Sequence, residues 1–177
     1  MFGYIGYRLL SVLFRRIRSI YIQDVFLKIA AVVIGAYGAY ALGANHAGSV
    51  FGVFSGLISV EHAALLGGLS IGLGVVTFSK RVMFTVGKRI LSLDHFASVV
   101  CVLGMSTTVW IYSLIGIPVS TSQAIVGAVI GAGFARGSKV ADRKMLLRIV
   151  LGWVQTPVVA GAVSATIYSL VRLIGRF

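Results

Sequence analysis

Two polar stretches inside otherwise apolar sequence hold the residues best suited to chemistry. The first, A-L-G-A-N-H-A-G-S-V-F-G, runs from Ala41 to Gly52, and the second, G-I-P-V-S-T-S-Q-A-I-V-G-A-V-I-G, runs from Gly116 to Gly131. Both interrupt apolar runs, which predicts broken helices whose free N–H groups and positive dipole ends face a bound anion. The candidate anion-binding residues are Asn45, Ser49, Ser120, Thr121, Ser122 and Gln123, and the candidate for proton coupling is His46.

Each of these side chains has a structural alternative to ligand binding. Hydroxyl groups in membrane helices usually bond back to their own helix, but three together at Ser120–Ser122, just after Pro118, favour ligand contact at a helix N-terminus. Asn45 can bind an anion, tie down a helix break, or do both. An ionisable residue inside a membrane span is functional by default, although His46 can also be a neutral, hydrogen-bonded ring. Gln123 stays open between the two roles.

The acidic residues and the cysteine predict neither an enzyme nor a metal site. The four acids, Asp24, Glu61, Asp94 and Asp142, all lie at the boundaries of apolar runs. No carboxylate pair is therefore embedded for hydrolysis or metal binding, and Ser120 has no base and orienting acid nearby in the sequence pattern. The single cysteine can form neither an internal disulfide nor a cysteine-pair metal site. We expect no catalytic residue, no bound metal and no cofactor.

Composition places the chain in a membrane. Of its 177 residues, 58% are hydrophobic and 11% are charged, and the mean hydropathy is +1.00. A soluble domain is roughly 45–50% apolar and about 25% charged. Only helices and closed barrels satisfy their backbone hydrogen bonds in a lipid bilayer. Long apolar runs without the alternation of barrel strands predict an all-α membrane protein.

The formal net charge of +12 would suggest nucleic acid as a partner if the chain were soluble. The basic residues, however, occur in clusters between the apolar runs, near residues 8–28, 80–89 and 136–148. Cytoplasmic loops of membrane proteins have this pattern under the positive-inside rule. We therefore expect a multi-pass protein of the cell membrane, with its basic loops in the cytoplasm, that does not bind nucleic acid.

The apolar runs predict two domains. Residues 1–23 carry a polar and basic stripe at helical spacing, which predicts an amphipathic helix in the membrane interface. Residues 24–177 are expected to form a single transmembrane repeat with about five crossings. The expected spans are Val25–Leu42, Ala63–Ser79, Phe96–Ile115, Ser120–Ala135 and Ile149–Leu173.

The region after the first span is expected to be irregular. Its helix is predicted to break at Gly43-Ala44-Asn45, and Ala47–Val60 is too short to span comfortably, which predicts a re-entrant segment. Small residues spaced four apart, Gly127 and Gly131, Gly35 and Ala39, and Gly68 and Gly72, predict close helix packing.

The two polar stretches together resemble the inorganic phosphate transporter family, which includes sulfate permeases. Its members carry a G-A-N-D-x-x-N-A-x-G motif and a G-x-P-V-S-T-T-H-A-x-V-G motif in each of two inverted halves. The resemblance covers Leu27 to Val171, including W-V-Q-T-P at Trp153–Pro157. It implies a symporter of inorganic phosphate, or alternatively of sulfate, that is driven by a co-transported proton or sodium ion. This chain resembles one repeat half of the family, the C-terminal one. The resemblance therefore implies an inverted partner half or a homo-oligomer.

Three positions depart from the family motifs. His46 stands in place of the aspartate, Ser49 in place of the second asparagine, and Gln123 in place of the histidine, whereas Ser122 keeps the hydroxyl of a threonine. Loss of the aspartate removes a natural ligand for sodium, while an imidazole can exchange a proton near neutral pH. The departures also favour a second hypothesis, in which the chain is a non-transporting membrane subunit that assembles with a full transporter.

Overall fold

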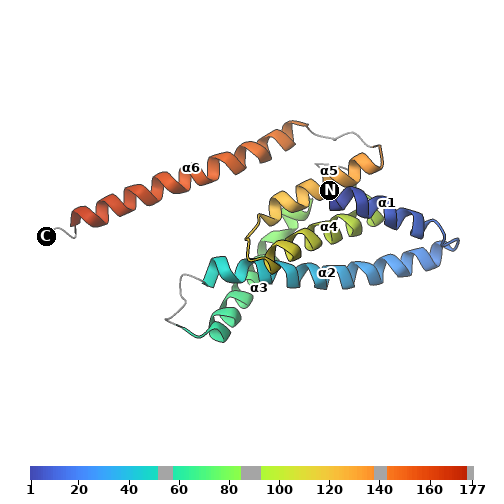
Figure 1. The fold of residues 1–177 in the computed structure, drawn as a ribbon, viewed down its shortest axis with the longest axis horizontal. Coiled ribbons are helices and arrows are strands. Elements are labelled where there is room, and N and C mark those ends of the chain that lie inside the picture. The colour runs from blue at the N-terminus through green and yellow to red at the C-terminus, as the bar shows by residue number, and fades with distance from the viewer. Residues whose placement is uncertain (52–57, 85–92, 138–142, 175–177) are drawn as a thin grey trace. The chain divides into compact units, whose positions relative to one another are not determined.

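The computed structural model describes residues 1–51, 58–84, 93–137 and 143–174, and six helices run through them (Figure 1). The helices are α1 (Phe2–Phe14), α2 (Ile20–Phe51), α3 (Val60–Phe84), α4 (His95–Leu114), α5 (Thr121–Ala135) and α6 (Arg143–Ile174). The chain divides into two units, residues 1–141 with α1 to α5 and residues 142–177 with α6. The prediction of an all-α membrane protein is confirmed.

Among the described residues, four helices are long and apolar enough to cross a bilayer. These candidate spans are Ile20–His46, Val60–Phe84, His95–Leu114 and Arg143–Leu173. The other crossing that the sequence predicts falls on α5, which has 15 residues, whereas a span needs about 17–25. A fifth crossing therefore stays a prediction.

The predicted helix break at Gly43-Ala44-Asn45 is wrong, because α2 continues without interruption from Ile20 to Phe51. No described atom lies within 4 Å of the position that a Cβ atom on Gly43 would take, so none of the described neighbours crowds the helix there. The Asn45 side chain bonds to a distant segment and does not compete for the backbone of its own helix. Residues 47–51 belong to α2, and the rest of the predicted re-entrant segment up to residue 57 lies outside the described residues.

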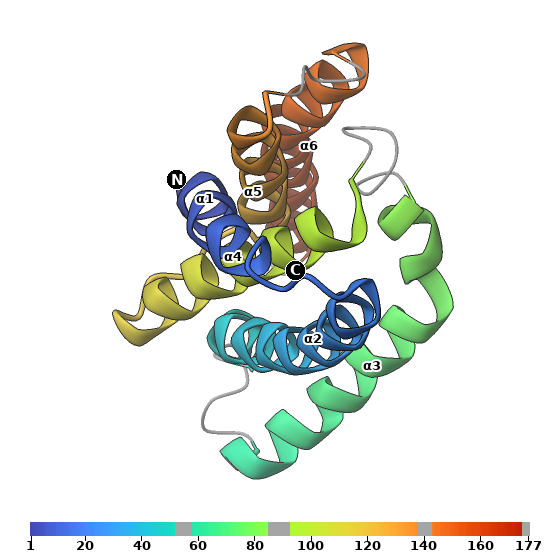
Figure 2. The ribbon, with the colours of Figure 1, turned by 90° about the vertical axis from the view of Figure 1, so that its right-hand side faces the viewer.

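Helix α4 is the centre of the first unit and contacts α1, α2 and α5 (Figure 2). Its buried residues are Ala97, Val100, Cys101, Gly104, Ser106 and Val109. They lie one to three residues apart from Ala97 to Val109, so α4 is covered along most of its length. Helix α3 packs against α2. The elements that hold the two polar stretches, α2 and the α4–α5 turn, are thus built around one central helix.

The N-terminal helix is shorter than predicted and packs against its neighbours. It ends at Phe14, and residues 20–23 already belong to α2. Gly3 is buried, and a Cβ atom there would overlap the Ala128 carbonyl of α5. A Cβ atom on Gly104 of α4 would lie 3.0 Å from the Gly3 nitrogen. This close approach is a small-residue contact of the kind that joins membrane helices. Placement of this helix in the interface stays a prediction.

Of the predicted glycine faces, one residue makes a close contact within the described structure. A Cβ atom on Gly131 would lie 3.1 Å from the Tyr4 nitrogen of α1. At Gly35, Gly68, Gly72 and Gly127, no described atom lies within 4 Å of that position. The predicted packing role is thus seen at Gly131.

Candidate functional site

The second polar stretch begins with a sharp reversal of the chain between α4 and α5. Gly116 has a φ of +73°, a conformation that glycine adopts without the strain of a Cβ atom. The Ile117 nitrogen donates to the Tyr112 carbonyl at 2.9 Å, and the Gly116 nitrogen donates to the Ser113 carbonyl at 3.1 Å. This hydrogen-bond pair is a Schellman motif, which ends α4. Pro118 then follows, where a helix cannot continue.

Asn45 connects the first polar stretch to the second. Its Nδ2 donates to the Val119 carbonyl at 2.9 Å, and its Oδ1 accepts from the Val119 nitrogen at 3.0 Å. The side chain is only 6% exposed, so both bonds form where an unpaired peptide group would be costly. Residue 119 immediately precedes the N-cap of α5. Asn45 therefore fixes the position of this helix N-terminus relative to α2.

The hydroxyl-bearing residues form the first turn of α5. Ser120 is the N-cap, and its side chain accepts from the Gln123 nitrogen at 3.4 Å. Its Oγ also lies 2.9 Å from the Ser122 Oγ. Ser120, Ser122 and Gln123 are exposed in this chain, and Thr121 is half-buried. The turn thus presents hydroxyl and amide groups at the positive end of a helix dipole, outward from the rest of the unit.

The structure places His46 and Ser49 less completely. His46 follows Asn45 on α2 and is half-buried. Ser49 lies in α2, among residues whose side chains are outside the described part of the structure. The structure therefore joins Asn45 to the segment that holds Ser120–Gln123, while anion binding by these residues and by Ser49 stays a prediction. In the described part of the chain, no cluster of three or more His, Cys, Asp and Glu residues is arranged to hold a metal ion.

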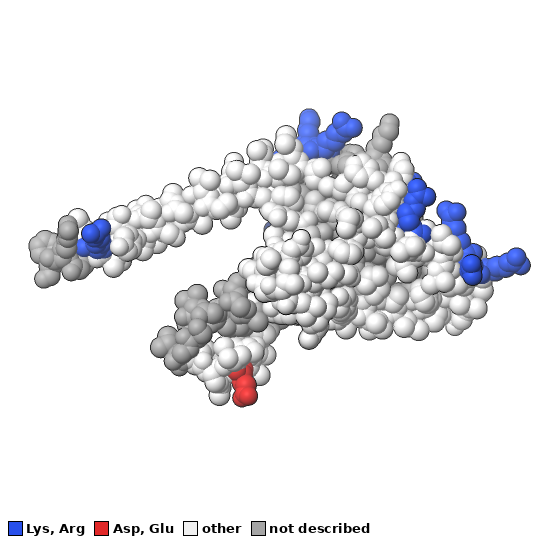
Figure 3. Space-filling view, viewed as in Figure 1, with Lys and Arg blue, Asp and Glu red and all other residues white. Residues whose placement is uncertain are grey.

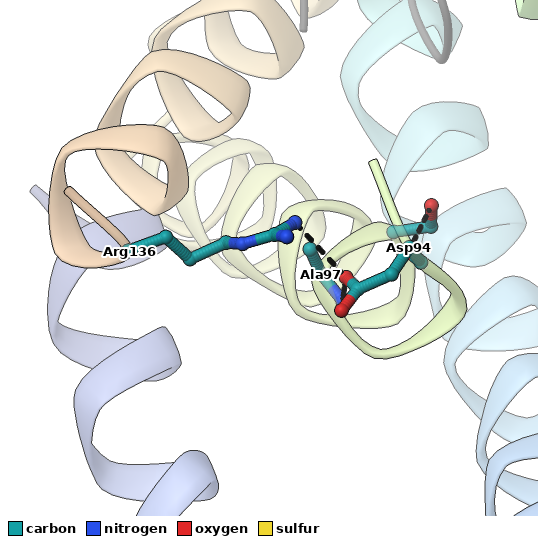
Figure 4. Close-up of polar contacts among 4 residues, drawn as sticks. Asp94, Ala97 and Arg136 are labelled. Carbon is teal, nitrogen blue, oxygen red and sulfur yellow. Dashed lines mark hydrogen bonds and ion pairs between the residues drawn. The ribbon is translucent and has the colours of Figure 1, made fainter. Parts of the chain in front are cut away.

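An ion pair connects the start of α4 to the end of α5. Asp94 caps α4 by accepting from the Ala97 nitrogen at 2.9 Å, and its Oδ1 lies 3.3 Å from Nη1 of Arg136, the C-cap of α5 (Figure 4). Because the start of α4 meets the end of α5, the two helices are antiparallel and the Ser120 turn lies at the other end.

Several basic residues of the first unit gather at the Asp94 end. Figure 3 shows lysine and arginine side chains over the region where α1 ends and α2 begins. Arg15, Arg16 and Arg18 occupy the connection between those two helices. The candidate site and the basic surface therefore lie at different ends of the unit.

One partner of the site was not predictable from side-chain types. The backbone of Val119 receives both hydrogen bonds of Asn45, and any residue type offers the same N–H and C=O groups. Proximity of Val119 to Pro118 and Ser120 was the single available signal, because it placed the residue just before a helix start.

Comparison with known proteins gives a consistent result. The sequence matches the phosphate transporter family over residues 14–164. A protein of Pyrococcus horikoshii named "putative phosphate permease" is 34% identical over 165 residues, which cover 86% of this chain and 41% of that protein. Proteins with the same description in Methanocaldococcus jannaschii and Haemophilus influenzae are each 33% identical, over 76% and 73% of this chain.

The chain spans about two fifths of the length of the first of these relatives. No solved structure shows significant similarity to this chain.

Proposed function

The chain belongs to the phosphate transporter family, and from that premise we propose that it is one half of a secondary transporter of inorganic phosphate. It is a multi-pass membrane protein. In this proposal an inverted half, on another or a longer chain, faces the Ser120 turn and completes the anion site. A co-transported proton or sodium ion supplies the driving force.

The observation that carries the proposal is the pair of hydrogen bonds between the Asn45 side chain and the Val119 backbone, here called the Asn45–Val119 clamp. Two hydrogen bonds of 2.9 and 3.0 Å hold the segment that enters α5, so the first turn has a fixed position before any ligand arrives. Fixed donors at a helix N-terminus are suited to a tetrahedral oxyanion, because they need not be ordered during binding. Ser120 and Ser122 are exposed in the isolated chain, which leaves their hydroxyls accessible to an ion and to a facing half.

Orientation follows from charge. We place the basic end of the unit, with Arg15, Arg16, Arg18 and Arg136, on the cytoplasmic side of the cell membrane, in line with the positive-inside rule. A chain with this bias inserts in one orientation, since dual insertion needs nearly balanced loops. A distinct inverted partner is therefore favoured over an antiparallel homodimer.

Thr121→Ala tests whether the first turn of α5 contacts the ion. We expect phosphate affinity to fall by about 1–2 kcal/mol, because a hydroxyl donor to a charged oxygen is lost. The measurement is titration calorimetry with phosphate, on the purified chain together with its partner half.

The matched control is Thr108→Ala. The Thr108 hydroxyl donates to the Gly104 carbonyl of its own helix at 2.7 Å, so its removal should leave affinity unchanged. Equal affinities for the wild type and the Thr121 variant would assign the Thr121 hydroxyl a purely structural role.

His46 carries the proposal for ion coupling. It replaces the family's aspartate and is half-buried beside Asn45, and a protonated imidazole and a bound anion would stabilise each other. We expect phosphate uptake by the wild type to rise as the external pH falls, and His46→Gln to flatten that dependence. Uptake that is driven by sodium and indifferent to pH between about 5.5 and 8 would contradict proton coupling through this residue.

Two other functions have specific support. Sulfate has the same tetrahedral shape as phosphate, and the family resemblance includes sulfate permeases, so sulfate is the second candidate substrate. The changes at His46, Ser49 and Gln123 support the alternative of a non-transporting subunit. Inhibition of phosphate uptake by a lower concentration of sulfate than of unlabelled phosphate would favour sulfate as the substrate. Complete absence of uptake with any partner half would favour the non-transporting subunit.

A further inference from the structure

An apolar pocket of about 350 Å³ lies between the end of α1, the first half of α2 and the start of α4. It occupies the basic end of the first unit, away from the Asn45–Val119 clamp, and no part of the proposed anion site uses it. Phe14, Phe26 and Phe96 line it, with the Phe14 ring centroid 4.8 Å from that of Phe96 and 6.2 Å from that of Phe26.

The interior of this pocket excludes polar ligands. Apart from one arginine, its lining side chains are aliphatic or phenylalanine, including Ala30 and Leu103. An apolar cavity gives water and ions no hydrogen-bond partners, so neither phosphate nor a water cluster would be stable there. A flexible hydrocarbon chain matches both the walls and the membrane setting.

A basic cluster adjoins the pocket. Arg16 is the one charged residue in its lining, and it is exposed at the α1–α2 connection between Arg15 and Arg18. A guanidinium group binds phosphate oxygens in a bidentate manner. Basic groups just beyond the start of a spanning helix lie at the depth of lipid headgroups. The apolar pocket thus suits the acyl chain of a phospholipid, and the adjoining Arg16 suits its headgroup phosphate.

A neighbouring cavity of about 520 Å³ shares Phe14 and Phe96 with this pocket and contains Asp24 and Asp94. Lys28 lies 2.6 Å from Asp24, and Arg136 lies 3.3 Å from Asp94. Because Lys28 and Arg136 are already paired with these carboxylates, the exposed Arg16 is the more favourable cation for an anionic headgroup.

We propose that this pocket binds one acyl chain of an anionic phospholipid from the surrounding bilayer, with the headgroup phosphate held by Arg16. The site is separate from the transport site and needs no substrate. Its occupant would fill the space between the α1–α2 connection and α4 and so hold these helices together at the basic end.

Photolabelling in liposomes tests the proposal. The full chain is reconstituted with phosphatidylglycerol that carries a diazirine in one acyl chain, and labelled peptides are mapped by mass spectrometry. We expect labels on the segments around Phe14, Phe26 and Phe96, with about fivefold less labelling in Arg16→Gln, as for loss of one basic contact with an anionic lipid. Arg8→Gln is the matched control, since Arg8 lies over the Tyr4 ring, 5.8 Å from its centroid, and is outside the pocket lining; its labelling should not change.

A second variant and a second lipid complete the test. Ala30→Leu narrows the pocket without touching charge and should also reduce labelling there. If diazirine phosphatidylcholine labelled the pocket as strongly as diazirine phosphatidylglycerol does, the choice of an anionic lipid would be overturned. Equal labelling of the Arg16→Gln variant and the wild type would have the same consequence. Labels on the exposed α3 residues Leu65 and Leu69 without labels in the pocket would show that the lipid reaches the protein but does not enter the pocket, and would overturn the proposal altogether.

Discussion

Asn45→Leu is expected to lower the free energy of unfolding by about 2–3 kcal/mol and to abolish detectable phosphate binding. Leucine has a similar size, so the change mainly removes two hydrogen bonds to Val119 and leaves its peptide groups unpaired. The segment that enters α5 would then lose its fixed position, and the donors of Ser120 and Thr121 would have to be ordered during binding. Unfolding in a graded detergent denaturant and phosphate calorimetry measure the two effects.

Ser106→Ala is the matched control for this variant. Ser106 is also buried, but its hydroxyl donates to the Val102 carbonyl, four residues earlier in the same helix, at 2.7 Å. Its loss leaves the helix bonds of α4 in place, so we expect a cost below about 1 kcal/mol and unchanged phosphate affinity. If Asn45→Leu were no more damaging than Ser106→Ala, the clamp would not position the site.

Gly3→Ala is expected to destabilise the chain by about 1–3 kcal/mol, the usual cost of overfilling a packed interior. The added Cβ atom would overlap the Ala128 carbonyl, which is backbone and cannot rotate away. Helix α1 would have to move off α4 and α5, and the Gly104 and Gly131 contacts would open with it. Thermal unfolding in the same detergent as for Asn45→Leu measures the change.

Gly127→Ala, on α5, is the control for Gly3→Ala, and we expect it not to destabilise the chain. No described atom lies within 4 Å of its Cβ position, so alanine should be neutral or stabilise by up to about 1 kcal/mol through helix propensity. Equal effects of the two substitutions would mean that α1 does not pack closely on α5.

The boundaries of α4 and α5 could be predicted from sequence because local chemistry specifies them. The sequence predicted Phe96–Ile115 and Ser120–Ala135, and the helices run from His95 to Leu114 and from Thr121 to Ala135. Asp94 and Ser120 cap their own helices, and Gly116 and Pro118 end the first of them. Each of these signals acts within a few residues, so a single sequence contains it.

The course of α2 could not be predicted in the same way. Gly43, Asn45 and His46 look like a helix interruption, yet α2 continues to Phe51. The partner of Asn45 is 74 residues further along the chain, and no local pattern reveals such a bond. The same limit applies to α1, whose basic stripe predicted an interfacial helix, whereas its Gly3 contact depends on the fold of α4 and α5.

The candidate site was predicted as two separate motifs, and the structure adds how they meet. Residue types identified Asn45 and the Ser120–Gln123 turn, because polar groups in apolar sequence are few. Their connection through the Val119 backbone explains why an amide side chain, which both donates and accepts, suits position 45. The roles of all seven candidate residues as ligands or coupling groups stay predictions.

Phosphate uptake into liposomes tests the central claim most directly. The chain is reconstituted alone and together with the opposite half of a full-length relative, and radiolabelled phosphate is followed under an inward proton gradient. We predict accumulation above equilibrium with both halves, inhibited by Asn45→Leu, and none with the chain alone. Accumulation by the chain alone, unchanged by Asn45→Leu, would contradict both the half-transporter and the site assigned to it.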